Sequence, residues 1–411
     1  MNHTFVKNLI IEKDTVKTNV NHLEFDLVYK EYVKKHNRIV SKLLRPSAKH
    51  TLSELPKVVV VRLDMNTGHG NRLPGIVCGF LYSLITDRLF FIDGYDNFES
   101  YYEKDFEHDW KIVTNLYKNS TSRYIHALNS YNDFSLVARG NLSNDELISY
   151  DVLYVRTWDY ACAPITSNPY YKNWFNKVIP DYRVFTAISL KLLRLHLNIS
   201  KQVETFVDNN FNDYNIGIHL RQKESPDDMI IPIEHYSQVV KMLMLGIKNM
   251  NISIFVVADN DSRKKLVKSL REVFNSNNNN SIKIVYTEQD MDSPNPVSWN
   301  ASPEVHALIV MKLLSLCDDL VITYGSSFGF TAAGWSQKAF RQRGPFVIMP
   351  IKNSNEELWA IDKVLVWGAI SSEPCMYLSK LLIDKEDEET IKVFKTNPLW
   401  MHHSQCHGSA K

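Results

Sequence analysis

Hydrophobic and polar residues alternate in blocks through the second half of the chain. Short apolar runs alternate with longer amphipathic stretches of helical period, which predicts buried strands separated by helices. The predicted strands are 214–220, 252–258, 282–287, 319–323 and 346–349, and the predicted helices lie near 232–247, 261–274, 303–317 and from 329 onward. Strands that alternate with helices of this length predict a parallel sheet covered on both faces. We therefore expect an α/β lobe over residues 206–350.

The first half of the chain predicts a second lobe over residues 51–205. The run VVVVRL after Lys57 predicts a strand, MNTGHGN a polar turn, LPGIVCGFLYSLITD a helix and RLFFID another strand, which together make a β-α-β unit. A strand at 150–156 and a helix over 183–197 complete this lobe. Residues 1–50 show no clear period and predict a peripheral helical extension, and residues 351–411 predict a segment that packs back across the lobes.

Composition places the chain among ordinary globular proteins of two or three domains, with 411 residues, 44% hydrophobic and 23% charged. A formal net charge of +1 and the lack of a long Lys/Arg block argue against nucleic acid or an anionic membrane surface as partner. Any anion-binding site should therefore be local.

The sequence does not decide in which cellular compartment the protein works. No segment is apolar for long enough to predict a transmembrane helix or a signal peptide, so we expect a soluble chain. Five cysteines without a CxxC pair indicate neither a zinc site nor a dense disulfide framework. Acceptor sequences for N-glycosylation would suit a secretory protein, although an Asn-rich chain produces them by chance; they begin at Asn2, Asn119, Asn141, Asn198, Asn251, Asn279 and Asn300.

The stretch from Gly217 to Asp228, GIHLRQKESPDD, places His219 and Arg221 at the end of a predicted buried strand. The carboxyl ends of parallel strands are where open α/β folds bind ligands. Arginine keeps its charge and presents a planar fork of donors that matches phosphate oxygens. This pattern favours a nucleotide diphosphate site. A structural ion pair of Arg221 with an acidic residue of the following loop, at 224, 227 or 228, is the alternative.

A second candidate site follows the strand DLVIT. The stretch YGSSFGF places Ser326, Ser327 and the backbone of Phe328 where a helix begins, and free N–H groups at such a helix end can hold a phosphate. The alternative is a helix N-cap by Ser326 or Ser327, which is worth about 1 kcal/mol. Both interpretations can hold together.

Two further stretches carry polar residues between a predicted strand and a predicted helix. The turn Gly68–Arg72 presents Asn71 and Arg72 and predicts either an anion or sugar site or a structural turn; it matches neither the P-loop nor the dinucleotide fingerprint. Asp259 and Asp261 follow another strand, where two carboxylates could hold a metal ion. We expect Asp261 instead to cap the following helix.

Four stretches together resemble the plant xyloglucan-type fucosyltransferases, in the same order and over roughly 57–380. GHGNRLPGIVCGFLYSLITDRLFFID is similar to the opening motif of that family, and GIHLRQKESPDD lies where the family has its arginine motif. LLSLCDDLVITYGSSFGFTAAGW and SSEPCMYLS resemble two later blocks. The sequence has His219 where the family pattern has Gln, which is similar to the HxR motif of other fucosyltransferases.

The resemblance implies a GT-B architecture with two facing Rossmann-like lobes and GDP-fucose in the cleft between them. It implies inverting transfer of fucose to a glycan acceptor, commonly to a galactose 2-hydroxyl, with no metal cofactor. Arg221, Asn71 and Arg72 are then the candidate catalytic residues, and His219, Arg221, Asp259, Ser326, Ser327 and Phe328 the candidate donor-binding residues. No general base stands out; His69 and Asp64 are the nearest candidates.

Family members are usually anchored in the Golgi, so the resemblance implies the secretory pathway, while the lack of a visible anchor leaves a cytosolic protein open. The disulfide of the family's EPC segment is not expected here, because Cys375 lacks a cysteine close downstream. The oligomeric state is open. Two other functions remain: a UDP-sugar transferase with a metal at Asp259 and Asp261, and a catalytically silent carbohydrate-binding protein.

Overall fold

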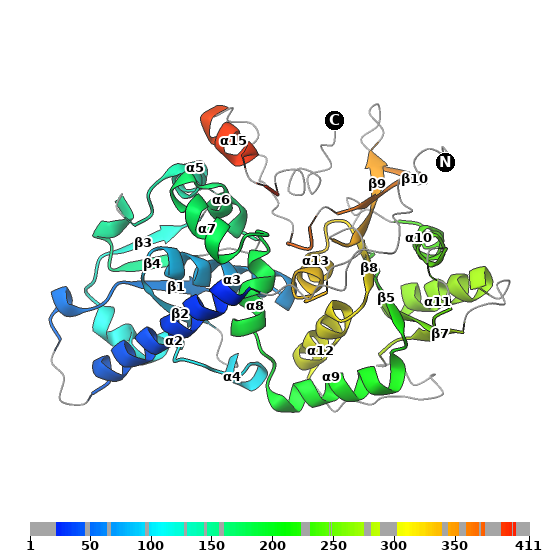
Figure 1. The fold of residues 1–411 in the computed structure, drawn as a ribbon, viewed down its shortest axis with the longest axis horizontal. Coiled ribbons are helices and arrows are strands. Elements are labelled where there is room, and N and C mark those ends of the chain that lie inside the picture. Colours follow the sequence, from blue (N-terminus) through cyan, green and yellow to red (C-terminus); the bar gives the residue numbers. More distant parts are fainter. Residues whose placement is uncertain are drawn as a thin grey trace. The chain divides into compact units, whose positions relative to one another are not determined.

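A computed structural model gives the fold of the chain (Figure 1). It describes residues 22–45, 50–63, 67–94, 98–126, 130–143, 146–155, 160–222, 231–245, 247, 249–274, 281–287, 302–338, 344–352, 359–369, 371–374, 388–396 and 398–399. These residues form two compact units. Of the described residues, those of 198–372 form the C-terminal unit, and those of 22–197 together with those from 373 onward form the N-terminal unit. The chain therefore returns to the N-terminal unit at Glu373.

The C-terminal unit is built on a six-stranded sheet in the order β10-β9-β8-β5-β6-β7. The five strands β5 to β9 are parallel, as the sequence predicted, and β10 pairs antiparallel with β9. The predicted boundary at 351 is wrong, because β9 continues through it and β10 extends the same sheet. The strands are β5 (Tyr214–His219), β6 (Ile252–Val257), β7 (Ile282–Val285), β8 (Asp319–Thr323), β9 (Phe346–Lys352) and β10 (Trp359–Gly368).

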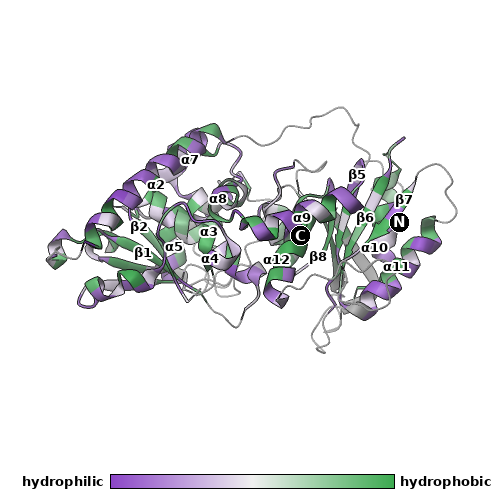
Figure 2. Ribbon diagram, turned by 90° about the horizontal axis from the view of Figure 1, so that it is seen from below, coloured by the Kyte–Doolittle hydropathy of each residue, from purple (hydrophilic) through white to green (hydrophobic). Residues whose placement is uncertain are grey.

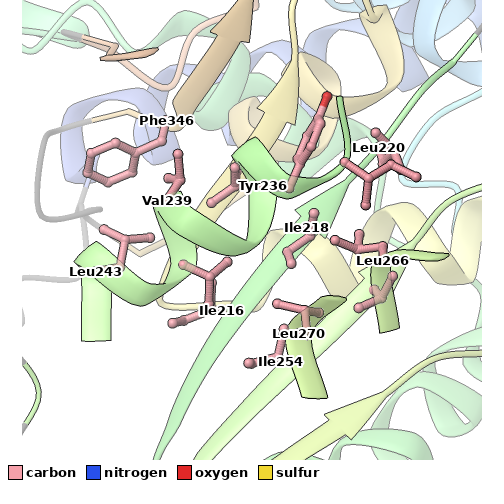
Figure 3. Close-up of a cluster of buried hydrophobic side chains, with 14 of the residues drawn as sticks. Ile216, Ile218, Leu220, Tyr236, Val239, Leu243, Ile254, Leu266, Leu270 and Phe346 are labelled. Carbon is pink, nitrogen blue, oxygen red and sulfur yellow. The ribbon is translucent and has the colours of Figure 1, made fainter. Parts of the chain in front are cut away.

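Helices cover both faces of this sheet, with α10 and α11 on one side and α12 and α13 on the other (Figure 1). On the first side Ile216 and Ile218 of β5 are fully buried against Tyr236 of α10 and Leu266 of α11 (Figure 3). Burial of such side chains stabilises each by about 1.5 to 3 kcal/mol. The helices are α9 (Leu197–Asn210), α10 (Glu234–Met244), α11 (Asn260–Phe274), α12 (Pro303–Ser315) and α13 (Ser327–Gly334).

The N-terminal unit contains a four-stranded parallel sheet in the order β2-β1-β4-β3. Its strands are β1 (Val58–Arg62), β2 (Leu89–Asp93), β3 (Ser122–Ile125) and β4 (Val152–Val155). Three of them match the predicted strands. The edge strand β3 was not predicted, because its residues SRYI are mostly exposed and lack an apolar run.

The helices of the N-terminal unit correct three sequence-based expectations. Gly68 is the N-cap of α3, so the stretch expected to be a turn forms the first turn of that helix. The helix expected over 183–197 is interrupted, since α8 ends at Leu192 and α9 starts at Leu197. Helix α2 is no peripheral extension, because Tyr32 packs edge-on against Phe80 of α3 with ring centroids 5.0 Å apart. The helices of eight residues or more are α2 (Leu23–Leu43), α3 (His69–Ile85), α5 (Tyr131–Arg139), α8 (Val184–Leu192) and α15 (Glu388–Lys395).

Strands rich in buried hydrophobic residues, and amphipathic helices with one apolar and one polar face, account for the packing of both units (Figure 2). A disulfide between Cys78 of α3 and Cys162 of α6 (Cys162–Ser167) joins two helices of the N-terminal unit across 84 positions of sequence. The spacing of the cysteines did not predict this bond. No helix among the described residues is long and apolar enough to cross a bilayer.

Candidate functional site

Three neighbouring strands bring the predicted donor-binding residues to one edge of the C-terminal sheet. Strands β8, β5 and β6 are adjacent and parallel, so their carboxyl ends open on the same side. Arg221 follows β5, Asp259 follows β6, and Ser326 to Phe328 follow β8. The sheet topology therefore brings together residues that are separated by more than a hundred positions in sequence.

His219, the last residue of β5, is buried beneath this edge and stacks on Phe328, with ring centroids 5.1 Å apart and planes 25° apart. Gly329 makes room for the imidazole, because a Cβ at that position would lie 3.1 Å from His219 Nδ1. Burial, with a smaller effect from the charge of Arg221, lowers the pKa of His219 to about 3. The imidazole is therefore neutral at physiological pH and is a poor general base.

The hydroxyl of Thr323, at the end of β8, fixes the backbone from which Arg221 projects. The Arg221 N–H donates to Thr323 Oγ1 at 2.9 Å, and Thr323 Oγ1 donates to the His219 carbonyl at 3.1 Å. Because this uses the hydroxyl proton of Thr323, the Tyr236 hydroxyl 2.6 Å away must donate to Thr323. One buried hydroxyl thus joins β5, β8 and α10. No motif or period along the chain predicted this role of Thr323.

The Arg221 side chain is exposed, whereas the following residue holds the backbone in place. Gln222 Nε2 donates to the Ile231 carbonyl at 2.9 Å, and Gln222 Oε1 accepts from the Ser262 hydroxyl at 3.3 Å. The amide therefore connects the end of β5 with α11 and with Ile231. Gln222 was also missed by the sequence analysis.

The start of α13 presents backbone donors at the same edge. Gly325 has φ +74, a conformation that favours glycine, and it turns the chain from β8 into the helix. Ser326 occupies the N-cap position, yet its side chain makes no capping hydrogen bond. Of the two residues considered as N-cap, Ser326 thus holds the position, without the side-chain hydrogen bond expected of such a cap. The first-turn N–H groups, with the positive end of the helix dipole, can bind an anion there.

Asp259 is exposed after β6 and caps α11, with Oδ1 accepting from the Ser262 N–H at 3.0 Å. The capping role expected of Asp261 is therefore wrong, since Asp261 lies within the first turn. The described part of the chain holds no group of three or more His, Cys, Asp or Glu side chains placed to bind a metal ion.

The remaining predicted site residues lie in the N-terminal unit, in the first turn of α3. Arg72 and His69 are buried and Asn71 is half-buried, and the rings of His69 and Tyr101 are perpendicular with centroids 5.9 Å apart. They are thus in a different unit from Arg221. Several residues named from sequence lie outside the described residues: Asp64, Glu224, Asp227, Asp228, Cys375 and the glycosylation acceptors Asn2, Asn279 and Asn300.

Glu373, in the segment that resembles the EPC block, is buried in the N-terminal unit. Its carboxylate accepts from the Phe185 N–H at 3.0 Å, in the first turn of α8, and from the Tyr160 hydroxyl. Burial is the main cause that raises its pKa to about 7, against the opposing effects of these donors and of Arg183. No role was predicted for Glu373 from sequence. Its contacts show that it anchors the returning chain to α8.

The fold and the site define a class: two α/β units with mainly parallel sheets, one of which has an exposed arginine and the start of a helix at its carboxyl edge, an arrangement that can bind an anion. A scan against protein-family models and a search of curated proteins both found no match.

Solved structures do match the fold. A mutant of Arabidopsis thaliana FUT1, a xyloglucan fucosyltransferase, in complex with GDP is 18% identical, with a TM-score of 0.66 over 89% of this chain and 86% of that chain. The NodZ alpha-1,6-fucosyltransferase soaked with GDP-fucose is 13% identical, with a TM-score of 0.48 over 76% of this chain and 99% of that chain. At that TM-score the NodZ likeness adds nothing to the assignment. The FUT1 match confirms the predicted GT-B fold class, and the likeness to fucosyltransferases that the motifs indicated is found in the fold as well.

Proposed function

We propose that the protein is a fucosyltransferase that moves fucose from GDP-fucose to a hydroxyl of a glycan acceptor. The observation that carries the proposal is the edge where Arg221, the neutral His219 and the start of α13 meet, in a fold shared with a protein solved with GDP. The motif resemblance supports the same donor. As finer parts of the proposal, the transfer inverts the anomeric carbon, needs no metal ion and goes to a galactose 2-hydroxyl.

In the proposed reaction the bond between fucose C1 and the β-phosphate oxygen breaks as an acceptor oxygen attacks C1 from the opposite face. The bonding electrons leave with GDP, and the proton of the acceptor hydroxyl passes to solvent water. Negative charge on the β-phosphate grows in the transition state, so Arg221 stabilises that state more than the bound donor. Ser326, Ser327 and the Phe328 N–H add hydrogen bonds to the phosphates.

The other predicted residues keep their proposed roles. Neutral His219 offers the donor a hydrogen bond, and Asp259 reads the guanine or ribose with the oxygen that does not cap α11. In the N-terminal unit Asn71 and Arg72 position fucose or the attacking hydroxyl.

Calorimetric titration with GDP and UDP, with and without Mn²⁺, tests the proposal. We expect GDP to bind without metal and Arg221→Ala to abolish that binding. Arg271→Ala is the matched control, because Arg271 is an exposed arginine on α11 of the same unit. Binding of UDP with Mn²⁺ in place of GDP would indicate the UDP-sugar alternative, and binding of neither nucleotide would indicate a silent carbohydrate-binding protein.

We also propose that the protein works in an oxidising compartment. This agrees with the Golgi location of the fucosyltransferase family that its motifs resemble. The observation is the Cys78–Cys162 disulfide, since such bonds persist mainly in secreted and secretory-pathway proteins. Mass spectrometry of the protein from its native source, after blocking free thiols, should find these two cysteines unmodified. Thiol blocking at both positions would contradict the proposal.

A further inference from the structure

The carboxyl edge of the N-terminal sheet carries an exposed group of aromatic and charged side chains with no assigned role. Tyr154 of β4 pairs in register with Tyr124 of β3, so both side chains leave the same face of the sheet. Their rings stack with centroids 4.8 Å apart and planes 18° apart. His126, two residues after Tyr124, continues the row with its ring 6.1 Å from that of Tyr124 and 17° off its plane.

Arg62, at the end of β1, lies over these rings. Its guanidinium carbon is 4.9 Å from the Tyr154 ring centroid and 5.6 Å from that of Tyr124. Its Nε donates to Asp93 Oδ2 at 2.9 Å, and its Nη1 donates to the Tyr124 hydroxyl. Tyr154 also packs against the buried cluster beneath, which contains Trp110. We call Arg62, Tyr124, His126 and Tyr154 the aromatic platform.

The platform is open to solvent although its members are held in place. Tyr124 is 41% exposed and the Arg62 side chain 44% exposed. Among the described residues only Asp93 and the Tyr124 hydroxyl accept from the Arg62 guanidinium, which leaves donors for a ligand. A rigid aromatic face beside unused donors combines an apolar contact surface with orienting hydrogen bonds, as in small-molecule sites.

Charge decides which ligand suits the platform. The Asp93 carboxylate compensates the Arg62 charge at 2.9 Å, so the site does not favour a phosphate or another anion. A sugar ring is neutral, carries C–H groups that pack on the negative face of an aromatic ring, and has hydroxyls that both Arg62 and Asp93 can bind. We propose that the aromatic platform binds a neutral oligosaccharide and is the acceptor subsite of this protein.

The acceptor role rests on the proposed function, whereas sugar binding by itself can be measured without turnover. The test is saturation-transfer NMR of the full chain with neutral oligosaccharides ending in galactose, glucose, mannose, xylose or N-acetylglucosamine, without nucleotide. We expect at least one to bind, and Tyr124→Ala to weaken that binding about tenfold. Tyr124→Phe keeps the stacking ring and should bind within about threefold of the unchanged protein.

Tyr170→Ala is the matched control, because Tyr170 is a 61% exposed tyrosine of the same unit outside the platform. It should leave sugar binding unchanged. Binding should also hold when NaCl rises from about 50 to about 500 mM, since a neutral ligand is not screened. The inference is overturned if no sugar binds, if Tyr124→Ala and Tyr170→Ala behave alike, or if only charged glycans bind.

GDP titration of the same samples separates this inference from the proposed function. If GDP binds and no sugar does, the proposal that the aromatic platform binds sugar is wrong and the donor assignment stands. If sugar binds through Tyr124 and GDP does not, the platform stands and the transferase proposal fails.

Discussion

The carboxyl edges of the two parallel sheets use arginine in opposite ways. In the C-terminal unit Arg221 is exposed at the strand end, and neutral hydroxyls and N–H groups surround its backbone. In the N-terminal unit Arg62 is paired with Asp93 and lies over two tyrosine rings. The first arrangement suits an anion and the second a neutral polyol. Similar sheets thus carry different chemistry through the residues at their strand ends.

Burial shifts the pKa of one titratable group in each unit. It lowers the pKa of His219 to about 3 and raises that of Glu373 to about 7, and in both cases it favours the neutral form. At the carboxyl edge of the C-terminal sheet this keeps the His219 imidazole uncharged. At the start of α8 it leaves a carboxyl close to its titration midpoint at neutral pH.

The largest expected effect on turnover comes from replacing Arg221, the exposed arginine of the C-terminal unit. Arg221→Ala should lower turnover roughly a hundredfold, or about 3 kcal/mol, because it removes a donor that stabilises charge in the transition state. Steady-state kinetics with GDP-fucose measure this, and the melting temperature should hardly change. Arg221→Lys should recover part of the rate, since it keeps the charge and loses the fork. A folded Arg221→Ala protein with normal turnover would contradict the donor assignment.

Glu373 should make stability depend on pH. Its folded pKa, about 7, lies above its ordinary value of 4.5, so its contribution is complete below pH 4.5 and is lost as pH rises through 7. The full loss is about 3 kcal/mol by the size of that shift. Urea unfolding of the unchanged protein and of Glu373→Gln between pH 5 and 8 measures it.

The difference between these two proteins isolates Glu373, because all other titrating groups are shared. The free energy of unfolding of Glu373→Gln should fall less over that range. Parallel pH profiles for the two would show that the carboxyl titrates as it does in water.

Thr323→Val should reduce turnover about tenfold and cost about 1 to 3 kcal/mol of stability, because it leaves the Tyr236 hydroxyl and the Arg221 N–H without their shared partner. Thr323→Ser keeps the hydroxyl and should restore turnover even where stability recovers only in part. That rescue separates positioning of Arg221 from simple loss of packing. Equal turnover in the Val and Ser variants would show that the hydroxyl does not position the arginine.

The smallest effect should come from removing the carboxylate that compensates the Arg62 charge at the carboxyl edge of the N-terminal sheet. Asp93→Asn removes the carboxylate beside Arg62, so this edge should gain weak, salt-sensitive affinity for inorganic phosphate, about threefold above the unchanged protein. Phosphate titration by NMR at low and high salt, with Arg221→Ala in the background, measures it. Unchanged phosphate affinity would mean that the carboxylate does not decide the ligand class of this edge.

The alternation of apolar runs and amphipathic stretches was enough to predict the parallel strands of the C-terminal unit. Strands β5, β6 and β8 are buried along nearly their whole length, so their apolar runs are visible in the sequence, whereas the edge strand β7 exposes Lys283. The edge strand β3 lacks such a run and was missed, and β10 was missed although its sequence contains the apolar run VLVW. Helix α2 was also misjudged although its buried positions recur at helical spacing, because three of them are Tyr and His residues whose burial depends on contacts such as that of Tyr32 with Phe80 of α3.

The sequence by itself determined the strand ends that carry His219, Arg221 and the start of α13, because local period and turn residues mark where strands stop. Only the tertiary structure decided what those residues meet. Thr323 and Gln222 act through partners from other elements, Glu373 is buried by a returning segment, and the platform exists because register places Tyr124 beside Tyr154. Contacts between distant segments depend on how the sheets assemble, and the hydrophobic pattern along the chain therefore does not predict them.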